Sequence, residues 1–424
     1  MRAFGDLSPQ PRKNTIYFRV VPAKAGTHNP RATGIASWVP ACAGTTAVVV
    51  RKLRHSDTAR IEQRDTRKKE KAVLKIGVLL GDDIGLEVVP EAVKCMKAAA
   101  AKTGLQIEWI DLPIGKRGHE THGHTMPQIT VDTLATVDGW LQGPIGHNVY
   151  PRNDQTWINP PLRKKFELFA NVKPVKSYPN LPSLHKDVDI VFLRETTEGM
   201  MSSSVVFAGA GEFRPNDEIS IGMRVVTRKG ASRVGREAFE IARTRKKKIV
   251  TCVHKEPVYR LVCGMFAEEH RKLAKEYPDV TLNEVLVDGF AMKLVMKPQQ
   301  FDVVVTTNQF GDILTDEGAG LVGGLGLAPG LVCGETQAMA QATHGSAPDI
   351  AGQNIANPFA MIMSGQMLLA WLGRKRNDAA ATAAAKVLDD AVDRVIAAGK
   401  HLTGDLGGRA KTTEFGDAVV AAMK

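Results

Sequence analysis

Long apolar runs and paired cysteines are both missing from this sequence. No stretch of 18 or more consecutive apolar residues occurs, which argues against a membrane-spanning helix. The five cysteines are dispersed, and none has a CxxC spacing to another (Cys42, Cys95, Cys252, Cys263 and Cys333). This set predicts neither a disulfide framework nor a zinc site. It favours a reducing compartment, so we expect a cytoplasmic protein.

The net charge of +11 looks at first like a signal for nucleic-acid binding. Residues 1–71 contain 15 Lys and Arg against five Asp and Glu, so this stretch holds ten of the eleven net positive charges. The rest of the chain is nearly neutral, and we expect no nucleic-acid partner for it. Binding of nucleic acid through residues 1–71 is kept as an alternative.

Residues 1–73 show no sustained apolar period, and Pro, Gly and Thr interrupt them repeatedly. The apolar stretch 47–50 is too short for the core of a secretory signal, and a transit peptide would need a clearer amphipathic helix. The segments VPAKAGTHNP and WVPACAGTT resemble translated bacterial intergenic repeat DNA. We therefore interpret residues 1–73 as a disordered or spurious basic extension of a bacterial protein, and expect the fold to begin near Leu74.

From Lys75 onward, short apolar runs typical of strands alternate with helical patterns. A run at 75–80 is followed by a turn and by apolar residues at helical spacing from Leu86 to Ala101. Further strand-like runs lie at 107–112, 189–193, 220–227, 248–253, 281–287 and 302–306. The Ala-rich stretch from Asp378 to Ala398 carries one apolar stripe and predicts a helix. This alternation favours an α/β fold with a largely parallel sheet.

Two acids in the segment NQFGDILTDEGAG are the strongest chemical signal in the chain. Asp312 and Asp316 lie four residues apart, so in a helix both carboxylates project from one face. Carboxylate oxygens are the ligands that Mg²⁺ and Mn²⁺ prefer. A third acid, Asp288, stands where the strand predicted at 281–287 would end. The alternative is that Asp312 caps a helix and Asp316 is a surface acid.

The surroundings of these acids resemble the metal-dependent β-decarboxylating dehydrogenases, the isocitrate/isopropylmalate dehydrogenase family. The resemblance runs from Lys75 to Met423, with its motifs in the family order. They are GDDIGLE (81–87), the pair at 143–144, LRKKFELFANVKPV (162–175), LRETTEG (193–199), VHKEPV (253–258), NQFGDILTDEGAGLVGGLGLAPG (308–330), HGSAPDIAGQNIANP (344–358) and DLGGRAKTTEFGDAV (405–419).

The resemblance implies roles for individual residues. Arg163 and Arg194 match arginines that hold substrate carboxylates, for which a planar fork of donors is suited. Asp312 and Asp316 match metal ligands, and Asp288 matches a third that reaches in from the partner subunit. Lys255, also from the partner subunit, matches the lysine that handles the hydroxyl proton. The family chemistry is oxidation of a 2-hydroxy acid followed by loss of CO₂.

The same resemblance implies a cofactor site that is not a Rossmann loop. The formal GxGxxG at 318–323 follows a carboxylate segment rather than a strand, so we interpret it as coincidental. The family site is instead the segment from His344, whose matching residues are His344, Gly345, Ser346, Ala347, Asp349, Ile350 and Asn357. An acid at Asp349 suits the ribose hydroxyls of NAD and would repel the 2′-phosphate of NADP. We therefore expect NAD together with Mg²⁺ or Mn²⁺.

Several positions depart from the family pattern. Lys173 stands where a second substrate arginine is usual, and Met201 where a tyrosine is expected to protonate the product. After Lys255 this chain has Glu256 and Pro257, whereas Ala-Asn commonly follows the matching lysine in the family. Reprotonation could then be slow, absent, or rerouted through water or Lys255. Trp157 replaces a serine of the isocitrate enzymes whereas Asn159 favours them, which leaves the third substituent of the substrate open.

The resemblance implies an isopropylmalate-dehydrogenase-like fold of two domains. Residues 74–168 with 322–424 form a discontinuous first, cofactor-side domain, and residues 169–321 form the second, with an intersubunit clasp at about 199–227. We expect a homodimer with a shared active site, acting with NAD on a 3-substituted (R)-malate such as isocitrate or 3-isopropylmalate. The alternative is a non-catalytic regulatory subunit. The histidines of RGHETHGH (His119, His122 and His124) are more readily explained as loop residues than as a metal site.

Overall fold

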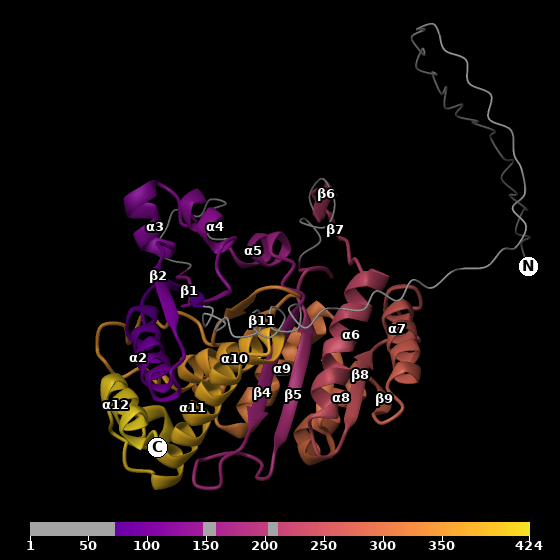
Figure 1. Ribbon diagram of the computed structural model, residues 1–424. Coiled ribbons are helices and arrows are strands. Elements are labelled where there is room, and N and C mark those ends of the chain that lie inside the picture. Colours follow the sequence, from indigo (N-terminus) through magenta and orange to yellow (C-terminus); the bar gives the residue numbers. More distant parts are fainter. Residues whose placement is uncertain (1–72, 147–157, 202–210) are drawn as a thin grey trace, which may run out of the picture. The chain divides into compact units, whose positions relative to one another are not determined.

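The computed structural model describes residues 73–146, 158–201 and 211–424 (Figure 1). Residues 1–72, almost all of the predicted extension, and Trp157 lie outside these ranges. The first strand begins at Leu74, where the sequence predicted the start of the fold. Among the described residues, no helix has both the length and the apolar character needed to cross a membrane.

Ten strands form one mixed sheet in the order β2-β1-β3-β12-β11-β4-β5-β10-β8-β9 (Figure 1). Their bounds are β1 Leu74–Leu79, β2 Ile107–Asp111, β3 Gly139–Gln142, β4 Ala170–Lys176, β5 Asp189–Glu195, β8 Ile249–His254, β9 Thr281–Leu286, β10 Val303–Thr306, β11 Leu331–Cys333 and β12 Ala338–Ala340. Pairing is parallel on both flanks and antiparallel from β12 through β11 and β4 to β5.

The α/β prediction is confirmed, and the prediction of a largely parallel sheet fits the flanks but not the centre. The centre differs because β11 and β12 form a hairpin, closed by a hydrogen bond from the Gly334 nitrogen to the Gln337 carbonyl oxygen at 2.9 Å. Strands of both predicted domains belong to this one sheet. The strands of the first domain adjoin those of the second at the β11–β4 pair. The division into two domains stays a prediction.

The helices fill the connections between strands. They are α2 Gly85–Thr103, α3 Gly115–His122, α4 Gln128–Leu134, α5 Asn159–Lys165, α6 Arg228–Arg243, α7 Val262–Glu276, α8 Val287–Met296, α9 Asn308–Val322, α10 Phe359–Arg376, α11 Ala379–Ala398 and α12 Thr412–Ala422, with short 3₁₀ turns at Pro298–Gln300, Leu325–Leu327 and Gly404–Leu406. Helices α2, α10, α11 and α12 pack against one another (Figure 1). The helices predicted at 86–101 and 378–398 are confirmed as α2 and α11.

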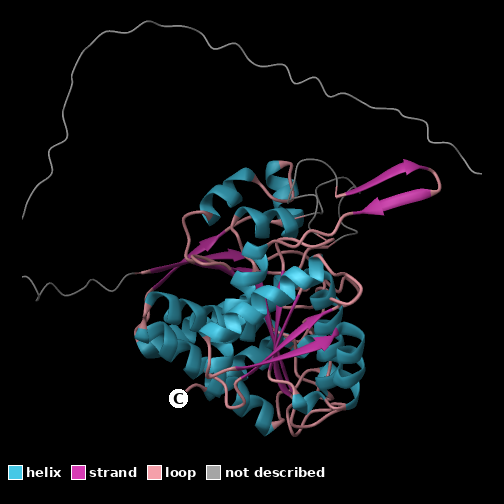
Figure 2. Cartoon of the chain, turned by 90° about the vertical axis from the view of Figure 1, so that its right-hand side faces the viewer, coloured by secondary structure: helices cyan, strands magenta, loops and turns pink. Residues whose placement is uncertain are grey.

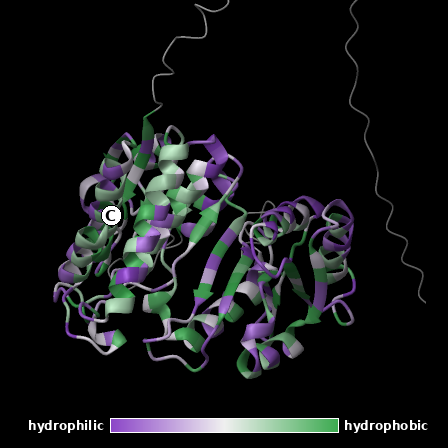
Figure 3. Ribbon diagram, turned by 60° about the horizontal axis from the view of Figure 1, so that its bottom comes forward, coloured by the Kyte–Doolittle hydropathy of each residue, from purple (hydrophilic) through white to green (hydrophobic). Residues whose placement is uncertain are grey.

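Both faces of the sheet are buried at strands such as β5 and β10, which explains why these strands read as continuous apolar runs, whereas the edge strand β9 is largely exposed. Along β5, Val191 and Leu193 belong to the core shared with α6, whereas Ile190 and Phe192 belong to a second core shared with α8 and α9. A third core lies under α5, around Trp140. Hydrophobic residues accordingly concentrate along the strands, and hydrophilic ones are frequent on peripheral helices and loops (Figure 3).

A separate two-stranded hairpin, β6 Glu212–Asn216 and β7 Ile219–Gly222, extends away from the sheet (Figure 2). All residues of both strands are exposed. The strand predicted at 220–227 is therefore wrong beyond Gly222, because Thr227 instead caps α6 by accepting a hydrogen bond from the Gly230 nitrogen. The hairpin lies within the segment predicted as the intersubunit clasp, and that role stays a prediction.

Candidate active site

A cavity of about 480 Å³ lies where the first residues of α5 and α9, the ends of β4 and β5, and the loop after β12 converge. It brings together nine of the residues singled out from the sequence, which are Asn159, Arg163, Lys173, Arg194, Met201, Asp312, His344, Gly345 and Ser346. Residues predicted to bind substrate and residues predicted to bind cofactor therefore share one cavity. These residues come from segments up to 187 positions apart (159 to 346).

Three cations face this cavity, and two of them, Arg194 and Lys173, pair with Asp312 and Asp316. Burial and the nearby Arg194 lower the pKa of Arg163 to about 9, and burial together with Arg194 lowers the pKa of Lys173 to about 8. The Arg163 Nε is buried without a hydrogen-bond partner among the described residues, and its Nη2 donates to Gln341 Oε1 at 3.4 Å. Depressed pKa values of grouped cations mean that an anion bound here would relieve their mutual repulsion. The cavity is suited to carboxylates.

Arg194 is held more firmly than the other two cations. Its Nε and Nη2 donate to Asn308 Oδ1 at 2.9 and 2.7 Å, and its Nη1 pairs with Asp312. The Asn308 Nδ2 donates to the Glu198 carbonyl oxygen at 2.8 Å, which fixes the amide orientation. Gly311 allows the close approach, because a Cβ there would lie 2.7 Å from Arg194 Cβ and Cγ. Sequence reasoning missed Asn308, although it opens the NQFGD segment.

Asp312 and Asp316 lie within α9, one turn apart, as the spacing predicted. The alternative that Asp312 caps the helix is wrong, because the N-cap residue is Thr307. Asp316 Oδ1 lies 3.6 Å from Lys173 Nζ, and both carboxylate side chains remain about half exposed. Hard oxygen ligands with open coordination space fit a divalent metal. The GxGxxG at 318–323 falls mostly inside the same helix, so it is not a nucleotide loop.

Asp288 and Lys255 are brought together with each other but do not line the cavity. Asp288 lies in the first turn of α8, Lys255 follows β8, and Lys255 Nζ lies 2.5 Å from Asp288 Oδ1. The hydrogen bond from Lys255 lowers the pKa of Asp288. Within the described part of one chain, Asp288, Asp312 and Asp316 do not form a group with ligand atoms within 4.8 Å of one another. The predicted three-acid metal site would therefore need two chains.

The cofactor segment is only partly at the cavity. Burial lowers the pKa of His344, which keeps the imidazole neutral, and the Ile84 nitrogen donates to the Ser346 carbonyl oxygen at 3.1 Å. Ala347 has a left-handed φ of +42°, Asp349 is exposed and Ile350 is half-buried. None of these three residues lines the cavity.

The Asn357 side chain, which is predicted to contact adenine, already forms hydrogen bonds within the chain. Its Oδ1 accepts from the Phe359 nitrogen at 3.0 Å, and its Nδ2 donates to Asp405 Oδ2 at 2.9 Å. The amide thus helps to start α10, and only its second N–H is left for a ligand. The adenine contact stays a prediction.

Two sequence motifs meet beside the cofactor segment. Gly81 adopts φ +74°, and a Cβ there would lie 2.3 Å from the Pro144 carbonyl oxygen, so only glycine permits this approach. The Asp82 carboxylate accepts from the nitrogens of Lys116 at 2.8 Å and Gly146 at 2.9 Å. The motifs at 81–87 and 143–144 therefore support each other at the cavity wall.

Met201 lies at the cavity, whereas His119 and His122 lie in a helix and not in the loop that the sequence suggested. The Met201 Sδ lies 3.6 Å from Arg194 Nη2, at the cavity and without a proton to donate. His119 and His122 lie in α3, and the Nδ1 of His124 accepts from the Met126 nitrogen at 3.0 Å. In the described ranges these histidines do not form a group of three metal-ligand atoms.

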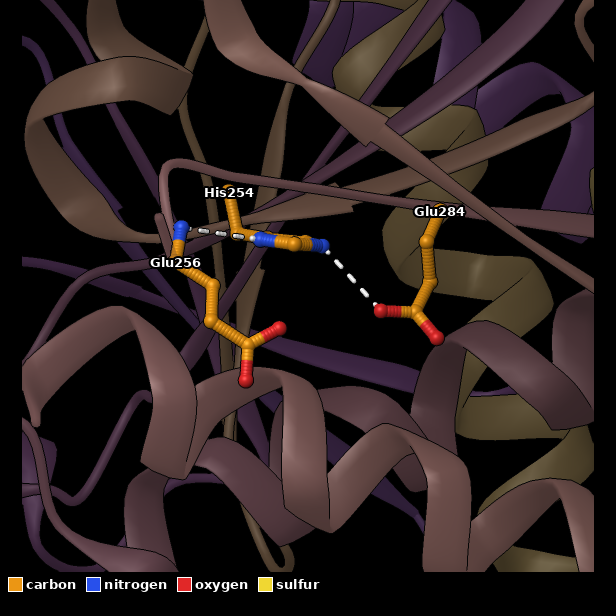
Figure 4. A group of neighbouring side chains, drawn as sticks. All are labelled: His254, Glu256 and Glu284. Carbon is orange, nitrogen blue, oxygen red and sulfur yellow. Dashed lines mark hydrogen bonds and ion pairs between the residues drawn. The ribbon is translucent and has the colours of Figure 1, made fainter. Parts of the chain in front are cut away.

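A group that sequence reasoning missed flanks Lys255. His254, Glu256 and Glu284 have ligand atoms within 4.8 Å of one another, as a metal site would require (Figure 4). However, His254 Nδ1 accepts from the Glu256 nitrogen at 3.2 Å, so the ring proton must be on Nε2, which faces Glu284 at 3.2 Å. Nε2 is then a donor rather than a metal ligand. Arg271 already bonds to both carboxylates, so the group is an ion-pair network.

Comparison with known proteins shows which family the chain belongs to. The family model described as isocitrate/isopropylmalate dehydrogenase matches residues 75–419. The chain belongs to the isocitrate/isopropylmalate dehydrogenase family. It is therefore a decarboxylating dehydrogenase, and this family uses a nicotinamide dinucleotide and a divalent metal.

The similarity covers nearly the whole length of the relatives described next. The isocitrate/homoisocitrate dehydrogenase of Thermus thermophilus is 40% identical over 350 residues, which is 82% of this chain and 98% of the relative. The 3-isopropylmalate/3-methylmalate dehydrogenase of Methanocaldococcus jannaschii is 38% identical over 354 residues, covering 82% and 99%. The crystal structure of isocitrate dehydrogenase from Methylococcus capsulatus matches with a TM-score of 0.73 at 38% identity, again covering 82% and 99%.

Proposed function

We propose that this family member is an NAD-dependent, Mg²⁺- or Mn²⁺-dependent enzyme of the bacterial cytoplasm. Its reaction is the oxidative decarboxylation of a 3-substituted (R)-malate, of the isocitrate, homoisocitrate or 3-isopropylmalate type. The observation that carries the proposal is the single cavity in which Arg163, Lys173 and Arg194 face Asp312 and the His344–Ser346 loop. The relatives named for these substrates support the substrate class. The buried free cysteines of the described residues support a reducing compartment.

The chain's own side chains account for substrate binding. Arg163 and Arg194 each offer a planar fork to a carboxylate, whereas Lys173 offers a single charged point. Because Asn308 and Gly311 fix Arg194, its fork is oriented before substrate arrives. Arg163 lines the cavity and donates a long hydrogen bond of 3.4 Å to Gln341, so its charge is open to an anion bound there.

The metal and the dinucleotide fit the residues present. Asp312 and Asp316 would hold the metal with Asp288 of the partner subunit, and the loop from His344 with Asp349 would hold NAD. When bound, the metal polarises the substrate hydroxyl and carbonyl oxygens, and the nicotinamide accepts the hydride. Lys255 of the partner subunit takes the hydroxyl proton. Met201 cannot return a proton to the product, so that proton comes from water or from Lys255.

A homodimer is supported by the surface beside Lys255 and Asp288. Large apolar side chains are exposed on nearby segments of the chain, among them Leu261 at 86%, Met296 at 71% and Ile313 at 63%. They come from the residue before α7, from α8, which carries Asp288, and from α9, which carries Asp312. Large exposed apolar side chains are typical of surfaces that another protein covers. A second copy covering this surface would bring its Lys255 and Asp288 towards the cavity.

The experiment is an assay of reduced dinucleotide and CO₂ from the full chain with Mn²⁺. Isocitrate, homoisocitrate, 3-isopropylmalate, D-malate and tartrate are each tested with NAD and with NADP. We expect turnover on one 3-substituted malate with NAD, abolished by a metal chelator. Bound NAD without turnover on any of these substrates would favour the regulatory-subunit alternative.

A further inference from the structure

The backbone around Lys255 is fixed on both sides of the residue. His254 ends β8, is 4% exposed, and its Nε2 meets Glu284 of the neighbouring strand β9. On the other side, the Glu256 nitrogen donates to His254 Nδ1 (Figure 4). The Lys255 carbonyl oxygen accepts from the nitrogens of Val258 at 3.1 Å and Tyr259 at 2.9 Å. Lys255 thus lies in a turn, and the residues on either side of it, His254 and Glu256, are both held by hydrogen bonds.

Arg271 of α7 joins these flanking residues to the sheet. Its Nη1 and Nη2 donate to the two Glu256 oxygens at 3.2 and 2.6 Å, and its Nε and Nη2 donate to the two Glu284 oxygens at 2.9 and 2.6 Å. Such two-sided bidentate pairing needs the planar fork of arginine. These contacts hold the pKa of Glu256 below its usual range. One guanidinium of α7 therefore links the turn to β9.

The sequence of the turn favours the same restraint, because Pro257 directly follows Glu256. Proline restricts the conformation of the residue before it, which stiffens the turn at Glu256. The carboxylate of Glu256 gives Arg271 a partner in addition to Glu284. The proline and the clamp therefore restrain the same residue.

We propose that Arg271 is a positioning residue for Lys255, acting through its clamp on Glu256 and Glu284. The inference rests on the proposed role of Lys255 as the group that takes the hydroxyl proton. Arg271 touches neither the cavity lining nor Lys255 itself, so substrate and dinucleotide binding do not depend on it. Its loss should therefore change kcat and leave KM nearly constant.

The test compares full-length Arg271→Met, Arg271→Lys and Arg236→Met. Arg236 is the matched control, because its side chain is similarly exposed and it joins α6 to α7 through an ion pair of 3.0 Å with Glu276. Hydrogen exchange of the peptide 254–261 reports on the turn without requiring activity. We expect Arg271→Met to speed this exchange about fivefold or more, and to lower kcat about tenfold with KM changed less than about threefold.

Arg271→Lys should be intermediate, because an ammonium keeps one ion pair but cannot engage both carboxylates. Exchange and kcat equal to those of Arg236→Met would overturn the proposal. Faster exchange with unchanged kcat would also overturn it, provided that Lys255→Met is inactive. If Lys255→Met keeps full activity, the proposed role of Lys255 is itself wrong, and that result is distinct from a failure of the clamp.

Discussion

Lys173 on β4 and Asp316 on α9 form an ion pair of 3.6 Å at the edge of the cavity, and Lys173 Nζ also donates to Thr315 Oγ1 at 2.9 Å. The lysine that replaces a family arginine thus lies between the anion-binding group and a predicted metal ligand. It partly neutralises Asp316 while facing Arg163 and Arg194. One cation therefore takes part in both halves of the site.

Replacing Lys173 by methionine should weaken substrate binding. A charge-assisted hydrogen bond contributes about 1.5–3 kcal/mol, so we expect the substrate KM to rise roughly 10- to 100-fold. Lys173→Arg, which restores the family residue, should keep KM close to that of the unchanged protein. Steady-state kinetics with NAD saturating measures this. An unchanged KM in Lys173→Met would exclude a substrate contact.

Met201→Tyr should accelerate the reaction if return of the proton limits turnover. A phenol can donate a proton where the thioether cannot, and general-acid catalysis contributes about 10²–10⁴-fold when that step is limiting. Met201→Phe is the matched control, because it has the ring without the hydroxyl. The measurement is kcat for CO₂ release. Equal kcat for the Tyr and Phe variants would show that a proton donor here is not needed.

The double variant Asp349→Lys, Ile350→Tyr should reverse the dinucleotide preference. Loss of an acidic acceptor for the ribose hydroxyls should lower kcat/KM with NAD by roughly 10- to 100-fold. The added lysine should raise kcat/KM with NADP. Asp349→Asn serves as a control for removal of charge alone. If the double variant and Asp349→Asn both keep the preference for NAD, Asp349 does not bind the ribose hydroxyls.

Glu198 should make the fold less stable as pH rises. Burial and the neighbouring Glu195 raise the pKa of Glu198 to about 7, although Thr227 donates two hydrogen bonds to it. Since the folded pKa exceeds the unfolded one, its contribution to stability is complete below about pH 4.5 and is lost as pH rises through about 7. Thermal melts at pH 5 and pH 8 should show a larger fall in Tm for the unchanged protein than for Glu198→Gln.

The raised pKa of Glu198 lowers the free energy of unfolding by about 3 kcal/mol at pH 8. Glu195 titrates together with Glu198, so the difference between the two proteins reports on this pair of carboxyl groups. An equal fall in Tm between pH 5 and pH 8 for the two proteins would contradict the assigned pKa.

Much of the fold was predictable because local patterns carried it. The apolar run of β1, the spacing of α2 and the stripe of α11 each follow from a few neighbouring residues. The strands β11 and β12 are only three residues long and were not predicted. The pairing of β11 with β4 and of β12 with β3 depends on partners far along the chain, which local periodicity cannot report.

The cavity residues were predictable through resemblance, whereas their supporting contacts were not. Asp312 and Asp316 share a helix, so their spacing alone suggested a metal. The clamp of Arg271 joins residues 256, 271 and 284 from three elements, and no spacing indicates such a contact. The second bonding partner of Asn357 is Asp405, 48 residues away, which sequence reasoning likewise missed.

The account depends most on an active site built from two subunits, with Asp312 from one and Lys255 from the other. Lys255→Met and Asp312→Asn are each expected to be inactive alone. When the two variants are co-expressed and allowed to form mixed dimers, one site of each mixed dimer has both native residues. The account predicts recovery of about a quarter of the unchanged activity at equal mixing. No recovery in dimers shown to be mixed would contradict a shared site.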